Sequence, residues 1–426
     1  MGSNSLNIKN ILNLFLILLP ILLISGPFLS DLAISILAVS SLFIIKEKKY
    51  YFNYFILFFI FFWLIILTSS FLSENNFTDL KNSVFYFRFA LFSLCVWYLL
   101  EKNKNILKYI YFVLIFSFSI LIFDSIFQYI NGYNIFNMEI IVENRISSFF
   151  GEELKMGGYF MRISPFLIGL SFFFFNKKKH QKLLPISIIY ILLIQITIFL
   201  SGERTSFFLF TFTIILFIIF LHEFKKTRFF LLIIYLVSFS FLITSDTPYK
   251  KRLIDFTIEQ SNINKGTQKK FIFSEQYNEH YRSAWNIFLD NKIFGVGVKK
   301  FREVCKVPKY NYSRLTCSTH PHNLPLQLIS ETGIFSFCIY LIINIFVWYL
   351  LLKSLFLKLG SRKKFLNNFQ ISLLINIAIL IWPLAPNGNF FNNWLSILNY
   401  YPVGFLLWSF KNQQKMYILS KKINSL

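Results

Sequence analysis

Long apolar runs separated by short polar segments make up most of the 426-residue chain. Each run holds roughly 20 residues with few charges, the length an α-helix needs to cross the hydrocarbon core of a bilayer. With 55% hydrophobic residues, the chain has more apolar surface than a soluble core absorbs. The pattern predicts an all-α integral membrane protein with about twelve transmembrane helices, at 11–29, 31–45, 52–72, 83–100, 106–130, 157–175, 184–201, 205–222, 229–245, 332–352, 366–384 and 393–410.

The second run is short enough to be a re-entrant segment instead of a full span. No signal-peptide cleavage site is evident, so we expect the first run to stay in the protein as a helix. One long polar stretch interrupts the series and divides the chain into three parts. These are transmembrane helices one to nine over 1–245, a loop domain over 246–331, and helices ten to twelve with a polar tail over 332–426.

The loop domain is predicted to contain an amphipathic helix at 277–290. The apolar side chains at helical spacing in it are Tyr281, Ala284, Trp285 and Phe288. Gly295 and Gly297 predict a tight turn directly after this helix. Residues 324–329 favour a short helix at the membrane interface, and Gly333 would let the chain bend into the tenth span.

The formal net charge of +23 resembles a signal for nucleic-acid binding, but its distribution argues otherwise. The basic residues gather in alternate loops, whereas the intervening short loops carry acidic residues and few cations. This positive-inside pattern predicts both termini in the cytoplasm and the loop domain on the outer side of the membrane. Membrane topology explains the charge, so we expect membrane lipids and no nucleic acid as partners. The basic clusters lie within 46–49, 102–108, 177–182, 225–228, 353–364 and 411–422.

The four cysteines divide by position. Cys95 and Cys338 fall within apolar runs, where a free thiol packs as a small hydrophobe. Cys305 and Cys317 lie twelve residues apart in the loop domain. In an oxidising periplasm they are expected to form a disulfide worth ~3 kcal/mol, and the alternative is a pair of free thiols.

His322 is the first candidate for chemistry, because it lies where the polar loop domain meets the next apolar run. An imidazole has an unperturbed pKa of about 6.5 and accepts protons readily near neutral pH. The alternative is a surface histidine that helps Asn323 to cap the next helix. A base at this depth suits a reaction between a lipid-borne substrate and a group outside the membrane.

Three arginines are predicted on the same outer side as His322. Arg204 lies in a very short turn between two apolar runs, Arg282 on the amphipathic helix, and Arg145 after the fifth run. A guanidinium presents a planar fork of donors that matches phosphate oxygens. Together the three would bind a diphosphate, and the alternative is that each one extends to lipid headgroups.

Four segments in order resemble the bacterial O-antigen ligases and the related O-antigen polymerases. His322 and Asn323 are followed, after nine residues, by Gly333, Ile334, Phe335 and Ser336, like the ligase pattern His-Asn, nine positions, Gly-x-x and a final Gly, Thr or Tyr. Ser336 departs from that last position. The other similar segments are 201–205 (Ser-Gly-Glu-Arg-Thr), 282–297 from Arg282 to the Phe-Gly-Val-Gly turn, and 145–158 from Arg145 to the Gly-Gly pair.

This resemblance implies a GT-C-like membrane glycosyltransferase that uses a glycan on undecaprenyl diphosphate. His322 would be the general base, and Arg204 and Arg282 would bind the leaving diphosphate. The expected reaction inverts the anomeric carbon and uses no cofactor or metal, since no Asp-x-Asp occurs in an outer loop. The favoured acceptor is lipid A–core, and the alternative is a polymerase that joins repeat units of O-antigen or exopolysaccharide. A lipid-linked glycan flippase or transporter ranks lower, because no internal repeat is visible.

Further polar residues are weaker candidates. Arg88 and Asp124 lie within apolar runs and would form either a structural ion pair or a site near the diphosphate. Glu203 is expected to orient Arg204. The other candidates are Arg162, which would join the arginines or extend to the interface; His320, a neighbour of His322; His280, expected to point away from Arg282 on its helix; and His180 and His222, excluded by their predicted cytoplasmic side.

Overall fold

The computed structural model describes residues 2–73, 76–174, 184–261, 273–361 and 364–411. The described residues are predominantly helical, and extended chain pairs among them at one isolated bridge, between Tyr133 and Glu139. Several residues of the predicted basic clusters lie outside the described residues, namely Lys177, Lys178, Lys179, Lys182, Arg362, Lys363, Lys415, Lys421 and Lys422, as does His180.

A helix stands at each of the twelve apolar runs. The helices are α1 (Gly2–Leu22), α2 (Pro27–Ile44), α3 (Tyr54–Phe71), α5 (Arg88–Lys102), α6 (Ile106–Asn131), α7 (Met156–Phe174), α8 (Leu184–Leu200), α9 (Arg204–Phe220), α10 (Lys225–Thr244), α15 (Leu324–Ser361), α16 (Asn368–Leu380) and α17 (Asn393–Lys411). Among the described residues, seven helices are long and apolar enough to cross a membrane, and four shorter apolar helices accompany them. The chain is a multi-pass membrane protein, whereas the count of twelve spans and the GT-C-like architecture stay predictions.

The second run is a complete helix. Helix α2 has 18 residues and is one of the seven that can cross a membrane by length and composition. Its N1 position is Pro27, which suits the first turn of a helix because proline lacks the N–H that would remain unbonded there. A re-entrant segment is therefore not required here.

The bundle is apolar on its outside as well as in its core. Every residue of α16 is buried, and α5 is almost entirely buried against α2 and α17. In contrast, α10 buries three side chains and exposes large ones such as Phe241 to its surroundings. Exposed aromatic and aliphatic side chains on the outer helices are stable in hydrocarbon, which supports the membrane assignment.

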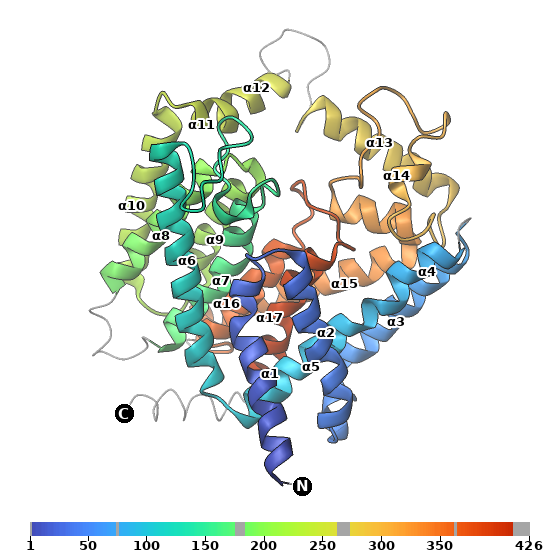
Figure 1. The fold of residues 1–426 in the computed structure, drawn as a ribbon, viewed down its shortest axis with the longest axis horizontal. Helices are drawn as coiled ribbons and strands as arrows, with labels where there is room; N and C mark the ends of the chain where they lie inside the picture. Colours follow the sequence, from blue (N-terminus) through green and yellow to red (C-terminus); the bar gives the residue numbers. More distant parts are fainter. Residues whose placement is uncertain (1, 74–75, 175–183, 262–272, 362–363, 412–426) are drawn as a thin grey trace.

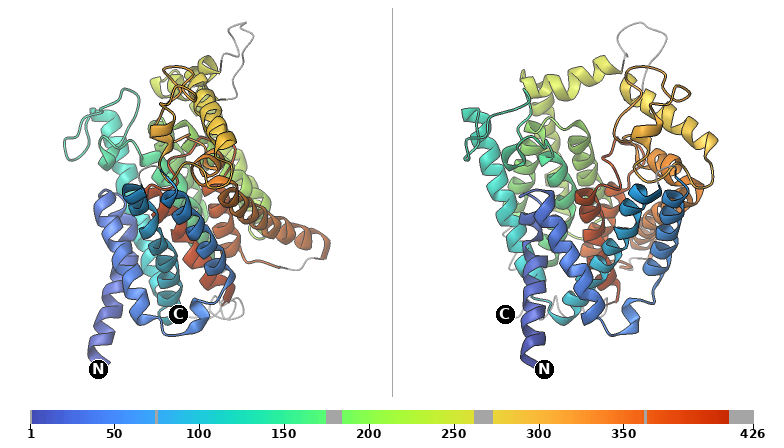
Figure 2. Two further views of the ribbon diagram at one scale, coloured as in Figure 1. Left: turned by 90° about the vertical axis from the view of Figure 1, so that its right-hand side faces the viewer. Right: turned by 45° about the vertical axis from the view of Figure 1, so that its right-hand side comes forward.

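The polar loop domain covers one end of the bundle. Figure 1 shows α12 and α13 at this end, while α1 starts at the opposite end, and Figure 2 shows the loops after α2 and α5 at that opposite end too. Short helices make up much of the domain: α11 (Pro248–Lys250), the π-helix η5 (Lys251–Asp255), α12 (Phe256–Gln260), α13 (Glu275–Asp290) and α14 (Phe301–Val304). Elsewhere the short elements are η1 (Lys48–Tyr50), α4 (Asn76–Val84), η2 (Phe85–Phe87) and η3 (Ser148–Phe150). The end that bears the loop domain is called the outer end below.

Glycines dock α13 onto α15. Gly295, Gly297 and Gly333 all have positive φ, and Gly333 is a non-helical residue at which α15 bends, as predicted. A Cβ on Gly333 would lie 2.0 Å from the Ile293 carbonyl oxygen, so only glycine fits. The Gly297 N–H donates to the Glu331 carbonyl oxygen at 2.9 Å. These contacts fix the amphipathic helix directly above the start of α15.

Candidate active site

His322 lies in a tightly held turn immediately before α15. It has a positive φ of 58°, which is rare for a residue with a side chain and costs on the order of 1–3 kcal/mol. The Asn387 N–H donates to the His322 carbonyl oxygen at 2.8 Å. The Asn323 side chain accepts from the Leu326 N–H at 3.1 Å and donates to the Pro383 carbonyl oxygen at 2.9 Å. Asn323 is therefore the cap of α15, and the side chain of His322 is not used for capping.

The ring of His322 is half-buried among other rings. Its centroid lies 4.0 Å from that of His320, and 5.4 Å from those of both His280 and Tyr277. Its Nε2 atom lies 3.0 Å from the Ser318 hydroxyl oxygen. Burial first, and then repulsion by the protonated forms of His320 and His280, lowers the pKa of His322 to about 3. The ring is therefore neutral at physiological pH, as a proton acceptor must be.

His320 has no nitrogen left for chemistry. Its Nε2 atom lies 3.0 Å from the Asn387 carbonyl oxygen, which can only accept, so Nε2 carries the proton. Its Nδ1 atom then accepts from the Thr319 hydroxyl at 2.9 Å. The ring is 6% exposed, and burial lowers its pKa to about 4. His320 is a neighbour that packs against His322.

His280 belongs to this group, although the sequence pattern assigned it no weight. It is fully buried on α13, and its ring stacks on that of His322 at an interplanar angle of 21°. Burial lowers its pKa, and the nearby Leu315 carbonyl opposes that shift. Ala284 and Phe288 of the predicted apolar face of α13 are buried, whereas Trp285 is 47% exposed and the polar His280 is buried beside them. We call His280, His320 and His322 the histidine cluster.

A second group of residues surrounds the turn between α8 and α9. Arg204, the first residue of α9, donates through Nε to the Arg252 carbonyl oxygen at 3.1 Å and through Nη1 to Gln260 Oε1 at 2.7 Å. Arg252 Nε donates to the Gly202 carbonyl oxygen at 3.3 Å. A Cβ on Gly202 would lie 2.7 Å from the Asn144 carbonyl oxygen, so the close turn needs glycine.

Arg145 completes this group from the loop between α6 and α7. Its Nε donates to the Ser201 carbonyl oxygen at 3.4 Å, and its Nη2 to that of Leu154 at 3.2 Å. Burial lowers its pKa, and the positive charges of Arg252 and Arg204 act in the same direction. We call Arg145, Arg204 and Arg252 the arginine cluster. The Glu203 carboxylate offsets part of the charge of Arg145, but the hydrogen bonds of all three arginines end on neutral acceptors, so net positive charge is available to an anion.

Two contacts connect the clusters. Burial raises the pKa of Tyr277, and the positive charge of Arg204 opposes that rise. The Tyr277 ring also packs against His322. Arg162 of α7 donates through Nη2 to Asn387 Oδ1 at 3.1 Å, and Asn387 holds both His320 and His322 by its backbone. Arg162 thus joins the site through an asparagine from the loop between α16 and α17, a contact that sequence spacing gave no signal for.

Comparison with known protein families identifies one segment of the chain. Residues 165–341 match the family model described as O-antigen ligase. This segment belongs to the O-antigen ligase family. No curated protein matches the chain. The resemblance found in the sequence motifs is therefore confirmed for this segment of the multi-pass membrane protein.

The O-antigen ligase domain does not contain the whole site. It begins within α7 and ends within α15, and it includes Arg204, Arg252 and all three members of the histidine cluster. Arg145, Arg162 and Asn387 are contributed by chain outside the matched segment. The site is therefore assembled from the domain and from the helices that flank it.

Glu203 differs from its expected role. Its carboxylate accepts from the Gly157 N–H at 2.8 Å and from the Ser206 hydroxyl at 2.9 Å. Burial raises its pKa, and the charges of Arg145 and Arg162 oppose that shift. Glu203 therefore faces Arg145 and Arg162, and its hydrogen bonds do not orient Arg204. The turn backbone points its carboxylate toward α7.

Arg282 is not brought against the histidine cluster. It is exposed, and its guanidinium carbon lies 4.0 Å from the centre of the Tyr312 ring. His280 lies two residues earlier on α13, which places the two side chains about 200° apart around the helix. His280 points toward His322, so Arg282 points away from it. The expected convergence of Arg204 and Arg282 is not present in this structure.

The expected ion pair between Arg88 and Asp124 is wrong. Arg88 donates instead to Asp31 Oδ1 at 2.7 Å, because α5 packs against α2. Asp124 Oδ1 accepts from the Ile135 N–H at 2.9 Å, and Oδ2 accepts from the Ser148 hydroxyl. Each charge therefore has a local partner on a different element. Both residues have structural contacts that explain their place in apolar helices.

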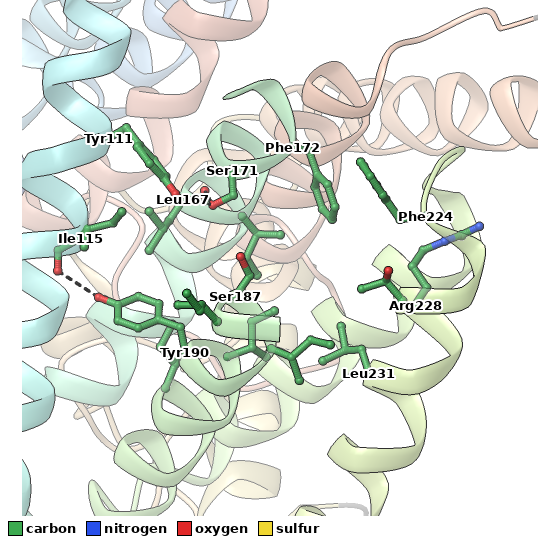
Figure 3. A pocket seen from close by; sticks show the side chains of 16 residues that line it. Tyr111, Ile115, Leu167, Ser171, Phe172, Ser187, Tyr190, Phe224, Arg228 and Leu231 are labelled. Carbon is green, nitrogen blue, oxygen red and sulfur yellow. Dashed lines mark hydrogen bonds between the residues drawn. The ribbon is translucent and has the colours of Figure 1, made fainter. Parts of the chain in front are cut away.

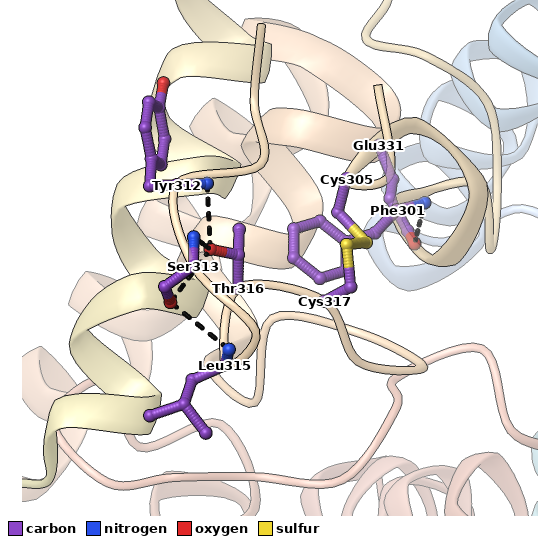
Figure 4. Close-up of a disulfide and its surroundings, with 8 residues drawn as sticks. All are labelled: Phe301, Cys305, Tyr312, Ser313, Leu315, Thr316, Cys317 and Glu331. Atoms are coloured by element: carbon purple, nitrogen blue, oxygen red, sulfur yellow. Dashed lines mark hydrogen bonds between the residues drawn. A yellow bond between two sulfur atoms is a disulfide. The ribbon is translucent and has the colours of Figure 1, made fainter. Parts of the chain in front are cut away.

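A disulfide precedes the His-Pro-His-Asn segment. Cys305 and Cys317 are joined, with Cα atoms 5.4 Å apart (Figure 4). Beside them the Thr316 hydroxyl accepts from the Tyr312 and Ser313 N–H groups at 3.0 and 2.9 Å. The disulfide connects α14 to the segment that leads into His320 and His322, so it limits the motion of both rings.

Two remaining expectations concern other histidines and metals. His222 lies between α9 and α10, at the end of α9 opposite Arg204, with Nε2 3.0 Å from the Ser354 hydroxyl oxygen. Within the part of the chain that the structure describes, no group of three or more His, Cys, Asp or Glu side chains is arranged to hold a metal ion.

Proposed function

We propose that the chain transfers a glycan from undecaprenyl diphosphate to an acceptor hydroxyl at the periplasmic face of the inner membrane. The acceptor proposed first is lipid A–core. Support comes from the O-antigen ligase domain and from one observation above all: Tyr277 packs against the neutral, half-buried His322 ring and also senses the positive charge of Arg204, from the cluster of three arginines at the same outer end. These are the groups needed to activate an alcohol and to stabilise a departing diphosphate.

In this mechanism His322 is the general base. The acceptor hydroxyl donates its proton to the neutral His322 ring as its oxygen attacks the anomeric carbon from the face opposite the diphosphate. The new carbon–oxygen bond forms while the bond to the diphosphate oxygen breaks, so the configuration at that carbon is inverted. The low pKa of His322 keeps the ring unprotonated before the donor binds, and the negative charge of the bound diphosphate raises that pKa, which strengthens the base.

The arginine cluster receives the leaving group. As the bond breaks, negative charge grows on the diphosphate, and fixed guanidinium groups stabilise that charge without needing to reorganise. Arg204 and Arg145 donate at present only to neutral oxygens, which an incoming phosphate can replace. We propose that these cations perform the task that a divalent metal performs in other sugar transferases. Transfer is then expected to persist in EDTA, and loss of activity that Mg²⁺ restores would contradict this part.

The alternative with the same donor is a polymerase that extends O-antigen or exopolysaccharide by repeat units. The two functions share the base, the diphosphate site and the stereochemistry, and they differ in the acceptor. The disulfide in the loop domain favours an oxidising compartment for either function.

The test is reconstitution of the purified chain in lipid vesicles with an undecaprenyl-diphosphate-linked glycan. One reaction contains lipid A–core and a second contains only lipid-linked glycan. Transfer to lipid A–core supports the ligase, and longer lipid-linked glycan in both reactions supports the polymerase. NMR of the new linkage should show inversion at the anomeric carbon. Active protein that yields a linkage of retained configuration, or no glycosidic product from either acceptor, would reject the proposal.

A further inference from the structure

An apolar groove opens among α6, α7, α8 and α10, far from the histidine cluster (Figure 3). Its volume is about 220 Å³. Side chains that line it include Leu167 and Ser171 of α7, Tyr190 and Ile191 of α8, and Leu231 of α10. The groove lies along the stretches of these helices that are remote from the loop domain.

Its polar side chains are directed to the protein. The Tyr190 hydroxyl donates to the Ile115 carbonyl oxygen at 2.9 Å, the bond drawn in Figure 3. The Ser171 hydroxyl donates to the Leu167 carbonyl oxygen at 3.1 Å. At the rim, Arg228 donates to the Ile218 carbonyl oxygen. A ligand in this groove therefore meets mainly hydrocarbon, and the chemical class that fits is an apolar chain.

The same helices carry the arginine cluster at their outer ends. The loop between α6 and α7 contains Arg145, the turn after α8 leads to Arg204, and the segment after α10 contains Arg252. From Ile188, beside the groove, to Gly202 the chain rises roughly 20 Å along α8 at 1.5 Å per residue. One set of helices thus has a cationic outer end and an apolar groove below it. This is the complement of an amphiphile with an anionic head and a long tail.

We propose that the groove binds the distal part of the polyprenyl tail of the diphosphate donor, so that the chain selects donors by tail length. The inference rests on the proposed function, because it takes the arginine cluster as the diphosphate site. The groove extends along α8 from Ile194, roughly 12 Å below Gly202, to Ile186, roughly 24 Å below it. The hydrocarbon core is about 30 Å thick, so an acyl chain anchored at the outer face extends roughly 15 Å and reaches only the upper part of the groove, whereas a polyprenyl tail is long enough to fill it. An inner-leaflet phospholipid is the competing occupant, and it would make the variants below change the KM of neither donor.

The experiment compares two donors with one glycan, one on undecaprenyl diphosphate and one on farnesyl diphosphate. Ser171→Phe and Ser187→Phe place a ring in the groove from α7 and α8. We expect each to raise the KM for the undecaprenyl donor about tenfold, since displacing a pair of buried methylenes costs about that factor, and to leave the farnesyl donor unchanged. The matched control is Ile189→Phe on α8, whose side chain is 59% exposed outside the groove, and it should change neither KM.

Equal losses with both donors, or no loss with either, would overturn the proposal. A second measurement does not depend on transfer or on the folding of variants. Undecaprenyl diphosphate with a photoreactive group at the end of its tail is irradiated with the wild-type chain in vesicles. Crosslinks within 167–171, 187–194 or 227–231 support the groove, and crosslinks confined to other segments reject it. If the wild-type chain uses neither donor but crosslinks here, the proposed reaction fails while the tail site stands.

Discussion

The histidine cluster and the arginine cluster occupy one end of the molecule and are built in opposite ways. In the histidine cluster, burial and ring stacking keep His322 and His320 neutral, with pKa values lowered to about 3 and about 4. In the arginine cluster, permanent charges from three segments surround the turn between α8 and α9, and their hydrogen bonds end on neutral oxygens. One region disfavours positive charge until a substrate arrives, and the other holds positive charge in advance. An anion bound between them would raise the pKa of His322 and make it a stronger base within the complex.

The largest expected effect separates the two clusters by function. His322→Ala should lower kcat for glycan transfer about a thousandfold, because a positioned base contributes on the order of 10²–10⁴. The KM for the donor should change little, since the arginine cluster stays intact. Steady-state kinetics in vesicles measure both parameters. His222→Ala, which removes a histidine at the far end of the bundle, is the control and should keep activity.

An unchanged kcat for His322→Ala would remove the basis for assigning the base. A loss that appears wholly in donor KM would mean that His322 contacts the donor and takes no proton. Membrane insertion and thermal midpoint are measured alongside, so that a misfolded variant is not counted as an inactive one.

The second prediction is that substitutions at Arg204 and Arg282, to which the motifs gave the same role, change the donor KM differently. Arg204→Lys should raise the donor KM about tenfold, because an ammonium cannot replace a bidentate fork. Arg282→Lys should change it less than about twofold, because a lysine over the Tyr312 ring keeps a cation–π contact of similar strength. Isothermal titration with undecaprenyl diphosphate checks both directly. Equal losses would show that α13 turns Arg282 toward the donor on binding, against the arrangement seen here.

Sequence patterns predicted those parts of the site that depend on one segment. Apolar runs located the helices, Gly333 located the bend in α15, and the motif located His322 and its cap Asn323. Each of these follows from local spacing. A motif also selected Arg282, but spacing says nothing about which face of α13 meets α15, and a shift of two residues reverses the direction of a side chain.

The missed residues depend on contacts between distant segments. Asn387 comes from the loop between α16 and α17, yet its backbone holds His320 and His322. Arg252 follows α10 and reaches the turn after α8. His280 is polar and lies on a buried face, so an apolar pattern could not find it. Long-range packing determines all three positions, and a single sequence carries no direct signal for it.

The third prediction concerns the pH dependence of kcat/KM, which reports on the free enzyme, and of kcat, which reports on the complex. A free histidine with its ordinary pKa of about 6.5 would lose half its base form at that pH. With the pKa of His322 lowered to about 3, the neutral form persists as pH falls, so kcat/KM should stay flat from about pH 7 to about pH 5. In the complex the bound diphosphate favours the imidazolium, so the acid limb of kcat should lie at higher pH than that of kcat/KM. An acid limb of kcat/KM near pH 6.5 would contradict the buried, neutral ring.

The smallest expected effect on the reaction comes from the disulfide. Cys305→Ser should lower the thermal midpoint, because losing the closed loop removes about 3 kcal/mol. Transfer at 25 °C should fall only a few-fold, because the Asn387 N–H and the Asn323 cap still hold the backbone on both sides of His322. Cys338→Ser, which replaces an exposed free cysteine, is the matched control. A reducing agent should reproduce the Cys305→Ser phenotype in the wild-type chain and leave Cys305→Ser unaltered. If reduction instead abolishes transfer, the disulfide contributes more than the Asn387 hydrogen bond to holding the histidine cluster in place.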